Sequence, residues 1–324
     1  MGLPIVRFDR NDGAGQSWGV HRDGNVYPLQ TVYPSHRDLM DSYFTSPEAF
    51  LSGLGATPIE VEAEQFISPV SQDVQLYCQG LNYADHRKES GVSAQDDDEG
   101  LMFMKAASSI CPPNAAILRP RGCQLLDYEI ELALVLKRDI AGQVAISDSD
   151  LPAYVGAVIL CNDVSARDFM FGAPMLQWFK GKSQRTFCPM GPVLYLMDAE
   201  DFRYLFALQL ELKLNGQVRQ SASTDLLIHR PAKTLSDISA YADMRAGDCL
   251  LTGTPGGVLA GTYLKVGLSI LLNFTNDRKR RLKFTEAQLA RTRFLEPGDV
   301  LELSIRTSDG AIDLGRQRNV IADA

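Results

Sequence analysis

Alternating apolar and polar positions begin close to the start of the chain. Residues 4–8 and 17–27 have the period of two that is typical of strands with one buried face. Asp23-Gly24 lies within the second stretch, where a two-residue hairpin turn needs positive φ angles. Ser46-Pro47-Glu48 has the order of cap, first-turn proline and acid that begins a helix. We therefore predict a small antiparallel sheet followed by a short helix.

Short apolar runs with the length of strands recur through the rest of the chain. Gly, Pro or Asn usually separates them, as at Asn215-Gly216, and no regular βαβ alternation is visible. This pattern predicts a mainly β (α+β) body. The predicted strands are residues 74–78, 128–136, 155–161, 192–195, 208–214, 249–252 and 300–305.

Two changes in the pattern divide the chain. Ser and Pro with polar flanks at residues 66–73 predict a boundary between a small N-terminal α/β domain, 1–72, and a larger C-terminal domain, 73–324. Residues 259–295 favour one or two amphipathic helices inserted before the last strands. Their basic run, residues 278–281, is expected to form a solvated face, and the acidic run at 96–99 a hydrated loop.

Composition narrows the class of function. With 324 residues and 45% hydrophobic content the chain can bury a sizeable core, and its net charge of -8 argues against nucleic-acid phosphates or anionic lipid as partners. The six cysteines form no CxxC pair and are expected to be reduced core thiols. We see neither a secretory signal nor a run of 18 apolar residues, and we expect a cytoplasmic protein without a membrane span.

Acidic residues two apart mark the strand predicted at 128–136. Asp127, Glu129 and Glu131 share one face of a strand, while the intervening residues are apolar. Partly buried carboxylates at this spacing repel one another unless a cation or raised pKa values relieve them. Oxygen ligands favour Mg²⁺, with Mn²⁺ or Ca²⁺ as alternatives, and Asp163 supplies a further acid. The structural alternative is a solvent-facing acidic stripe.

Three other segments carry candidate chemistry. If residues 81–89 are helical, His86 and Glu89 share a face, and Glu89 can orient the imidazole to accept a proton from water; an ordinary surface pair is the alternative. Lys182, after a glycine, could place a cation beside developing negative charge. The glycines of residues 252–258 permit close backbone approach to a ligand, although they also suit an ordinary turn.

Taken in order, segments 81–89, 127–136, 162–168, 181–183 and 252–258 resemble the fumarylacetoacetate hydrolase family. The likeness runs from about residue 74 to 258 and resumes near 296–319. It implies a mixed β-sandwich roll, usually dimeric, that uses Mg²⁺ or Mn²⁺. Met170 departs from the pattern, because many members have a substrate-contacting Gln there, and this change favours a more apolar or differently shaped substrate.

The resemblance also implies roles for individual residues. Asp127 becomes a supporting acid beside the metal ligands. The implied metal ligands are Glu129, Glu131 and Asp163; the catalytic residues are His86, Glu89 and Lys182; and the substrate contacts are Tyr83, Lys105, Arg167 and Thr254.

The predicted reaction is hydrolysis of a carbon-carbon bond in a 2,4-dioxo acid, of the acylpyruvate or fumarylacetoacetate type, by water that the His-Glu pair activates. A decarboxylase, hydratase or tautomerase would use the same metal and lysine. From another class, a catalytically silent protein that binds an oxo acid or metal is also consistent with the sequence. The expected partners are a small oxo acid and a second copy of the chain.

Overall fold

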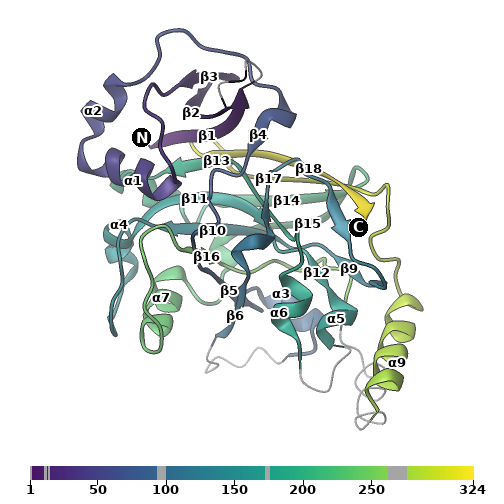
Figure 1. Ribbon diagram of the computed structural model, residues 1–324. Coiled ribbons are helices and arrows are strands. Elements are labelled where there is room, and N and C mark those ends of the chain that lie inside the picture. Colours follow the sequence, from purple (N-terminus) through teal and green to yellow (C-terminus); the bar gives the residue numbers. More distant parts are fainter. Residues whose placement is uncertain (1, 11–12, 14, 93–99, 172–175, 262–275) are drawn as a thin grey trace.

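A large mixed sheet forms the centre of the molecule (Figure 1). The computed structural model describes residues 2–10, 13, 15–92, 100–171, 176–261 and 276–324. The strand order is β3-β2-β1-β13-β11-β10-β16-β5-β6, with β4 beside β1 and β7 beside β13. These strands are β1 (Leu3–Arg10), β2 (Gly15–Arg22), β3 (Asn25–Pro28), β4 (Phe66–Ile67), β5 (Leu76–Gly80), β6 (Leu101–Lys105), β7 (Ile110–Cys111), β10 (Ile130–Leu136), β11 (Val155–Asn162), β13 (Cys188–Leu196) and β16 (Cys249–Leu251).

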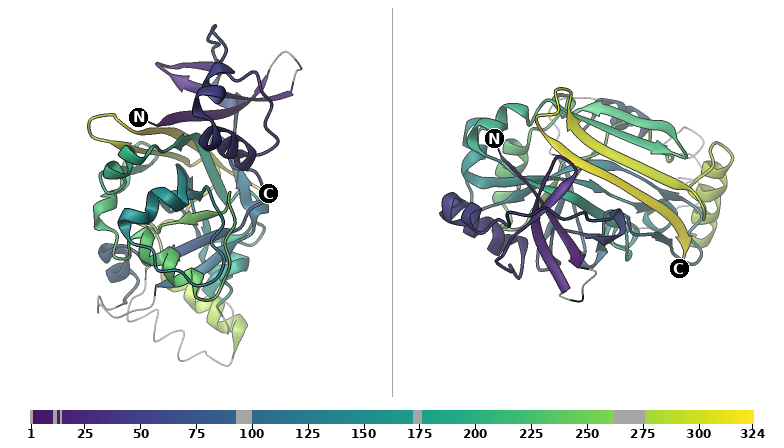
Figure 2. Two further views of the ribbon diagram at one scale, coloured as in Figure 1. Left: turned by 90° about the vertical axis from the view of Figure 1, so that its left-hand side faces the viewer. Right: turned by 90° about the horizontal axis from the view of Figure 1, so that it is seen from above.

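A second sheet packs against the first, and the helices lie around both (Figure 2). Its order is β15-β14-β17-β18-β8, while β9 and β12 form a separate pair. These strands are β8 (Ile117–Arg119), β14 (Leu208–Leu214), β15 (Gln217–Ser223), β17 (Val300–Thr307), β18 (Asp313–Asp323), β9 (Leu126–Asp127) and β12 (Ser165–Ala166). The described α-helices are α1 (His36–Thr45), α2 (Pro47–Ser52), α3 (Ala84–Glu89), α4 (Leu151–Tyr154), α5 (Arg167–Phe171), α6 (Trp178–Lys182), α7 (Pro231–Ser239) and α9 (Asp277–Leu289). Short 3-10 helices are η1 (Ala63–Gln65), η2 (Ala107–Ser109), η3 (Asp148–Asp150), η4 (Ala199–Tyr204) and η5 (Thr224–Leu226).

Two apolar cores lie on opposite faces of the large sheet. In β10, Leu132 belongs to the core shared with the second sheet, which includes Leu210 of β14. The next residue, Ala133, belongs to the core shared with α1, which includes Leu39. Because both faces are covered, β10 and β11 are apolar along nearly their whole length, as expected for doubly buried strands. The predicted mainly β sandwich roll is confirmed.

Most predicted strands form close to their predicted positions. Asp23 and Gly24 have φ angles of 52° and 78°, which confirms the hairpin turn between β2 and β3. The sequence pattern did not predict β18, because two of its four buried positions are polar: Leu314 and Ile321 are apolar, but Gln317 and Asn319 are not. The predicted boundary at residues 72 and 73 falls between β4 and β5, and β1 pairs with β13 of the large sheet.

The predicted insertion contains α9, whose buried side chains follow a helical period. One part of its basic run contradicts the expected solvated face, because Arg280 is only 2% exposed. Arg281 instead reaches Asp168 of α5, with 3.4 Å between Nη2 and Oδ2. Residues 262–275 of the insertion and the acidic run at 96–99 lie outside the described residues.

The six cysteines are all buried and free, as predicted. No described helix combines the length and the apolar character needed to cross a membrane.

His36 joins the N-terminal segment to the main body. Its Nε2 lies 2.9 Å from the carbonyl oxygen of Gly247, and its Nδ1 accepts a hydrogen bond from the Ser71 amide at 3.2 Å. This pairing requires a neutral ring. Burial lowers the pKa of His36 from 6.5 to about 4, despite the attraction of Asp73.

Acid is therefore expected to destabilise the protein through His36. Below pH 6.5 the unfolded chain takes up a proton that the folded chain takes up only near pH 4. The free energy of unfolding should fall by about 3 kcal/mol between neutral pH and pH 4 from this group. Urea unfolding across this range checks the prediction. In a His36→Gln variant, the free energy of unfolding should no longer show this part of its dependence on pH. The control His21→Gln changes a half-buried histidine of β2 and should keep most of that dependence. The same pH dependence in wild type and His36→Gln would contradict the assignment to His36.

Candidate active site

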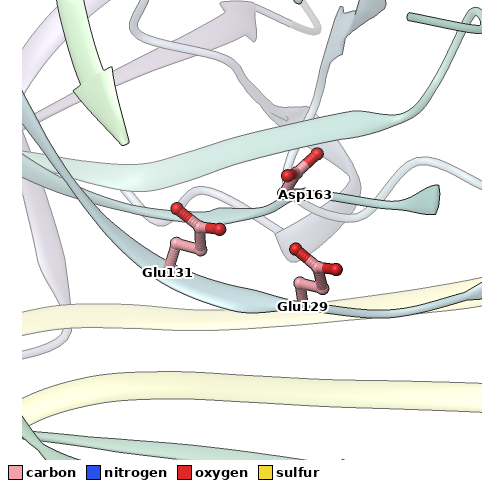
Figure 3. Close-up of side chains that lie close together, drawn as sticks. All are labelled: Glu129, Glu131 and Asp163. Atoms are coloured by element: carbon pink, nitrogen blue, oxygen red, sulfur yellow. The ribbon is translucent and has the colours of Figure 1, made fainter. Parts of the chain in front are cut away.

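Three buried carboxylates meet where β10 and β11 run side by side (Figure 3). Glu129 directly precedes β10, Glu131 lies within it, and Asp163 directly follows β11. The antiparallel register places Asp163 opposite Glu129, and the Asp163 amide donates to the Glu129 carbonyl at 2.8 Å. One oxygen from each side chain lies within 4.8 Å of the others. Strand register therefore brings the three predicted ligands together.

Two buried lysines contact this acidic triad. The Nζ of Lys182 lies 2.8 Å from Glu129 and 2.6 Å from Asp163. The Nζ of Lys105 lies 2.6 Å from the other oxygen of Asp163 and also donates to the carbonyl of Lys182. Burial alone would lower the pKa of Lys105, but the charge of Asp163 more than offsets this and the pKa is raised. Lys105 thus holds the Asp163 carboxylate in place from a position that does not line the cavity described below.

Arg167 connects the triad to Asp127. Its Nε donates to Asp127 at 2.9 Å, and its Nη2 lies 2.5 Å from Glu129. Asp127 also accepts from the amides of Leu259 and Ala260, both at 3.0 Å. Asp127 therefore supports Arg167 and the start of the insertion, which agrees with its expected supporting role.

Among the described residues, the four carboxylates of this cluster form ion pairs with only three cations, Lys105, Lys182 and Arg167. The ion pairs join Asp127, Glu129 and Asp163 to three cations, while Glu131 has no ion pair among the described residues. Burial raises the pKa of Glu131 well above its usual value, and the charges of Asp163 and Glu129 raise it further. Burial would also raise the pKa of Glu129, but Lys182 and Arg167 hold it well below the ordinary value.

A further cation would relieve the repulsion at Glu131. Three carboxylates without His or Cys in the set form a donor group suited to a hard divalent ion. The triad therefore fits a metal site.

A glycine turn after β16 holds two carboxylates. The amide of Gly253 donates to Glu131 at 2.8 Å, and the amide of Gly257 donates to both oxygens of Glu89 at 3.0 and 3.1 Å. Gly253 and Gly257 have φ angles of +98° and +104°, which side chains with a Cβ rarely adopt. The backbone of residues 252–258 was predicted to approach a ligand closely. In the structure it approaches the acidic side chains of Glu131 and Glu89.

His86 and Glu89 lie on one face of α3, as predicted. The Nδ1 of His86 is 3.9 Å from Oε2 of Glu89, which is beyond hydrogen-bonding distance. His86 is 7% exposed, and its Nδ1 has no hydrogen-bond partner in the described part of the chain.

The side chain of His86 lines a cavity of about 260 Å³ above the triad. Its ionisable lining consists of His86, Glu129, Glu131, Arg167 and Lys182. Its apolar lining includes Leu81, Val92, Leu101, Phe103, Phe171, Trp178, Val258 and Phe284. Ionisable groups and apolar surface thus line the same cavity.

Six of the ten predicted site residues line this cavity: His86, Glu129, Glu131, Arg167, Lys182 and Thr254. The hydroxyl of Thr254 donates to the carbonyl of Ile130 at 2.9 Å. Tyr83 and Lys105, expected to contact substrate, are 2% and 3% exposed and do not line it. Glu89 and Asp163 do not line it either, but they lie 3.9 Å from His86 and 2.6 Å from Lys182, which do.

Met170 also lies away from the cavity. Its side chain is fully buried, and a Cβ on Gly181 would lie 2.2 Å from its Cγ. Helix α5 turns Met170 inward and presents Phe171 to the cavity, so the residue at the position of the family's substrate-contacting Gln does not line the cavity. The aromatic lining was missed because Phe103, Phe171, Trp178 and Phe284 are scattered along the chain and form no motif.

The roll, its buried acidic triad and the adjoining cavity have the form of an enzyme active site. Residues 75–322 match the family model for the fumarylacetoacetate (FAA) hydrolase C-terminal domain, and the chain belongs to this family. It is 33% identical over 264 residues to the mitochondrial oxaloacetate tautomerase FAHD2A of Bos taurus, covering 79% of this chain and 82% of the relative.

Two further comparisons agree with this membership. The chain is 32% identical to the 2,4-didehydro-3-deoxy-L-rhamnonate hydrolase of a Sphingomonas strain, covering 76% and 84% of the two chains. The fold is similar to that of fumarylacetoacetate hydrolase from Exiguobacterium antarcticum, with a TM-score of 0.75, 26% identity and coverage of 99% and 100%. Relatives therefore include both hydrolases and tautomerases.

Proposed function

We propose that this enzyme hydrolyses a carbon-carbon bond in a 2,4-dioxo acid. The observation that carries the proposal is the position of His86, whose imidazole lines the cavity beside the carboxylate triad and has Glu89 at 3.9 Å. This arrangement suits a base that activates water close to a bound cation. A reaction that only moves a proton within the substrate would not need water to be activated.

We further propose Mg²⁺ as the ion, held by Glu129, Glu131 and Asp163. The hard oxygen donors support this choice, as does the lack of an ion pair to Glu131 among the described residues. When bound, Mg²⁺ would supply an electrophile for the substrate oxygens and favour charge development on them.

The protein's own groups account for the remaining steps. Arg167 binds the substrate carboxylate, and His86 takes a proton from water as the water oxygen bonds to the 4-oxo carbon. The bond between carbons 3 and 4 then breaks, and its electron pair remains on the carbon-3 fragment as an enolate. Lys182 stabilises that charge, and the proton held by His86 passes to carbon 3. The products are a carboxylic acid and a 2-oxo acid.

Tautomerisation of an oxo acid is the second candidate, and the names of the FAHD2 relatives favour it. The same His86 could move a proton between carbon 3 and the 2-oxo oxygen without any attack by water. Homodimeric assembly and a cytoplasmic location stay predictions from the sequence.

Turnover in ¹⁸O-labelled water separates the two reactions. Hydrolysis places one heavy oxygen in the carboxylic acid product and yields the 2-oxo acid in equal amount. Mass spectrometry of both products checks this expectation. Proton exchange at carbon 3 without cleavage would reject hydrolysis and favour the tautomerase.

A further inference from the structure

A continuous row of aromatic rings forms one wall of the cavity. The ring centroids of Phe103 and Trp178 are 5.2 Å apart, those of Trp178 and Phe171 are 6.1 Å apart, and those of Phe171 and Phe284 are 5.6 Å apart. The four rings come from β6, α6, α5 and α9, and all line the cavity. We call these four residues the aromatic wall.

The aromatic wall starts at the reactive centre. The Nζ of Lys182, which contacts Glu129 and Asp163, also lies 5.1 Å from the centroid of Phe103. From Phe103 the ring contacts continue through Trp178 and Phe171 to Phe284 on α9. The ionisable residues described in the cavity lining all belong to the triad or lie beside it. No described cationic residue therefore lines the cavity along the rest of the aromatic wall.

Helix α9 is fastened to the site at several points. Phe284 is 3% exposed, and the side-chain amide of Gln288 donates to the carbonyl of Gly261 at 2.6 Å. Arg281 contacts Asp168 and lies over the ring of Phe169 at 4.9 Å. The inserted helix is therefore part of the cavity wall, and Phe284 and Gln288 are its lining residues.

We propose that the aromatic wall binds an uncharged, ring-sized apolar group attached to the 4-oxo carbon of the substrate. This inference rests on the proposed function and narrows its substrate class. A phenyl group would bury apolar surface against Trp178, Phe171 and Phe284, which favours binding. A tail that ends in a second carboxylate would lose its hydration there without gaining a cationic partner from the described wall residues. Phe284 is accordingly a specificity-determining residue supplied by the insertion.

Binding to three substrates tests the proposal separately from turnover. Calorimetry would use the full-length His86→Gln variant with Mg²⁺ and 2,4-dioxo acids that carry a methyl, a phenyl or a carboxylate tail. The phenyl-tailed acid should bind at least about 10-fold more tightly than the methyl-tailed acid, and the carboxylate-tailed acid should bind more weakly than the phenyl-tailed one. Equal affinities, or tightest binding of the carboxylate-tailed acid, would overturn the inference. Retained phenyl preference with no cleavage by wild type would reject only the proposed hydrolysis.

A matched pair of substitutions on α9 locates the effect. Phe284→Ala should weaken binding of the phenyl-tailed acid about 10-fold and that of the methyl-tailed acid less than about 3-fold. Leu282→Ala, on the face of the helix where Leu282 is 54% exposed, should change neither. If Phe284→Ala fails to fold, Phe284→Leu keeps an apolar side chain and should still reduce the phenyl preference. Equal weakening of both ligands would overturn the assigned role of Phe284.

Discussion

A His86→Gln enzyme is expected to lose about 10³-fold in kcat while binding Mg²⁺ normally and unfolding at nearly the wild-type temperature. Glutamine removes the base but retains a polar side chain, and general-base catalysis contributes effects of about this size. His86 makes no hydrogen bond through Nδ1 to the described protein, so its replacement should disturb the fold little. Steady-state kinetics, calorimetric Mg²⁺ titration and thermal unfolding measure the three quantities.

His21→Gln provides the control for this variant, because His21 lies on β2 in the N-terminal segment and not in the cavity. It should retain wild-type kcat. Glu89→Gln should lower kcat less than His86→Gln, since the glutamine oxygen can still accept from the Gly257 amide. A His86→Gln enzyme with wild-type kcat would remove the proposed base from the mechanism.

The second large effect is expected from Glu131→Gln, which should weaken Mg²⁺ binding by at least about 100-fold and lower kcat with it. The loss of one of the three proposed carboxylate ligands accounts for the expected effect. Stability without metal should be unchanged or higher, because Glu131 has no described ion pair and its oxygen can still accept from Gly253 as an amide. Calorimetry with Mg²⁺ and unfolding in EDTA measure both properties.

Asp163→Asn gives the contrasting result. This change weakens the ion pairs of Asp163 with Lys105 and Lys182, both buried, and should cost about 3 kcal/mol in the free energy of unfolding. Metal affinity should fall in both variants, but only Asp163→Asn should be strongly destabilised without metal. Wild-type Mg²⁺ affinity in Glu131→Gln would contradict the assignment of the triad.

The residues of the acidic triad could be predicted from the sequence because their pattern is local and periodic. Glu129 and Glu131 are two apart, and Asp163 ends an apolar strand, so strand register could bring them together. The relation of His86 to Glu89 likewise followed from helical spacing.

Other features depend on tertiary packing and have no local signal. Whether Lys105 faces the cavity or lies behind Asp163 depends on how β6 packs against the site. The burial of Arg280 and the position of Phe284 depend on where α9 docks, and a count of charges in the insertion could not predict either. The cavity-facing position of Phe171, next to the inward-facing Met170, depends in the same way on how α5 packs.

Metal-dependent cleavage tests the central claim most directly. Purified enzyme would be incubated with a phenyl-tailed or methyl-tailed 2,4-dioxo acid in Mg²⁺ or in EDTA, with diketo-enol absorbance and pyruvate followed together. We predict loss of absorbance in Mg²⁺ with one pyruvate and one carboxylic acid formed per substrate consumed, and little loss in EDTA. Absence of pyruvate from both substrates in Mg²⁺ would contradict carbon-carbon hydrolysis.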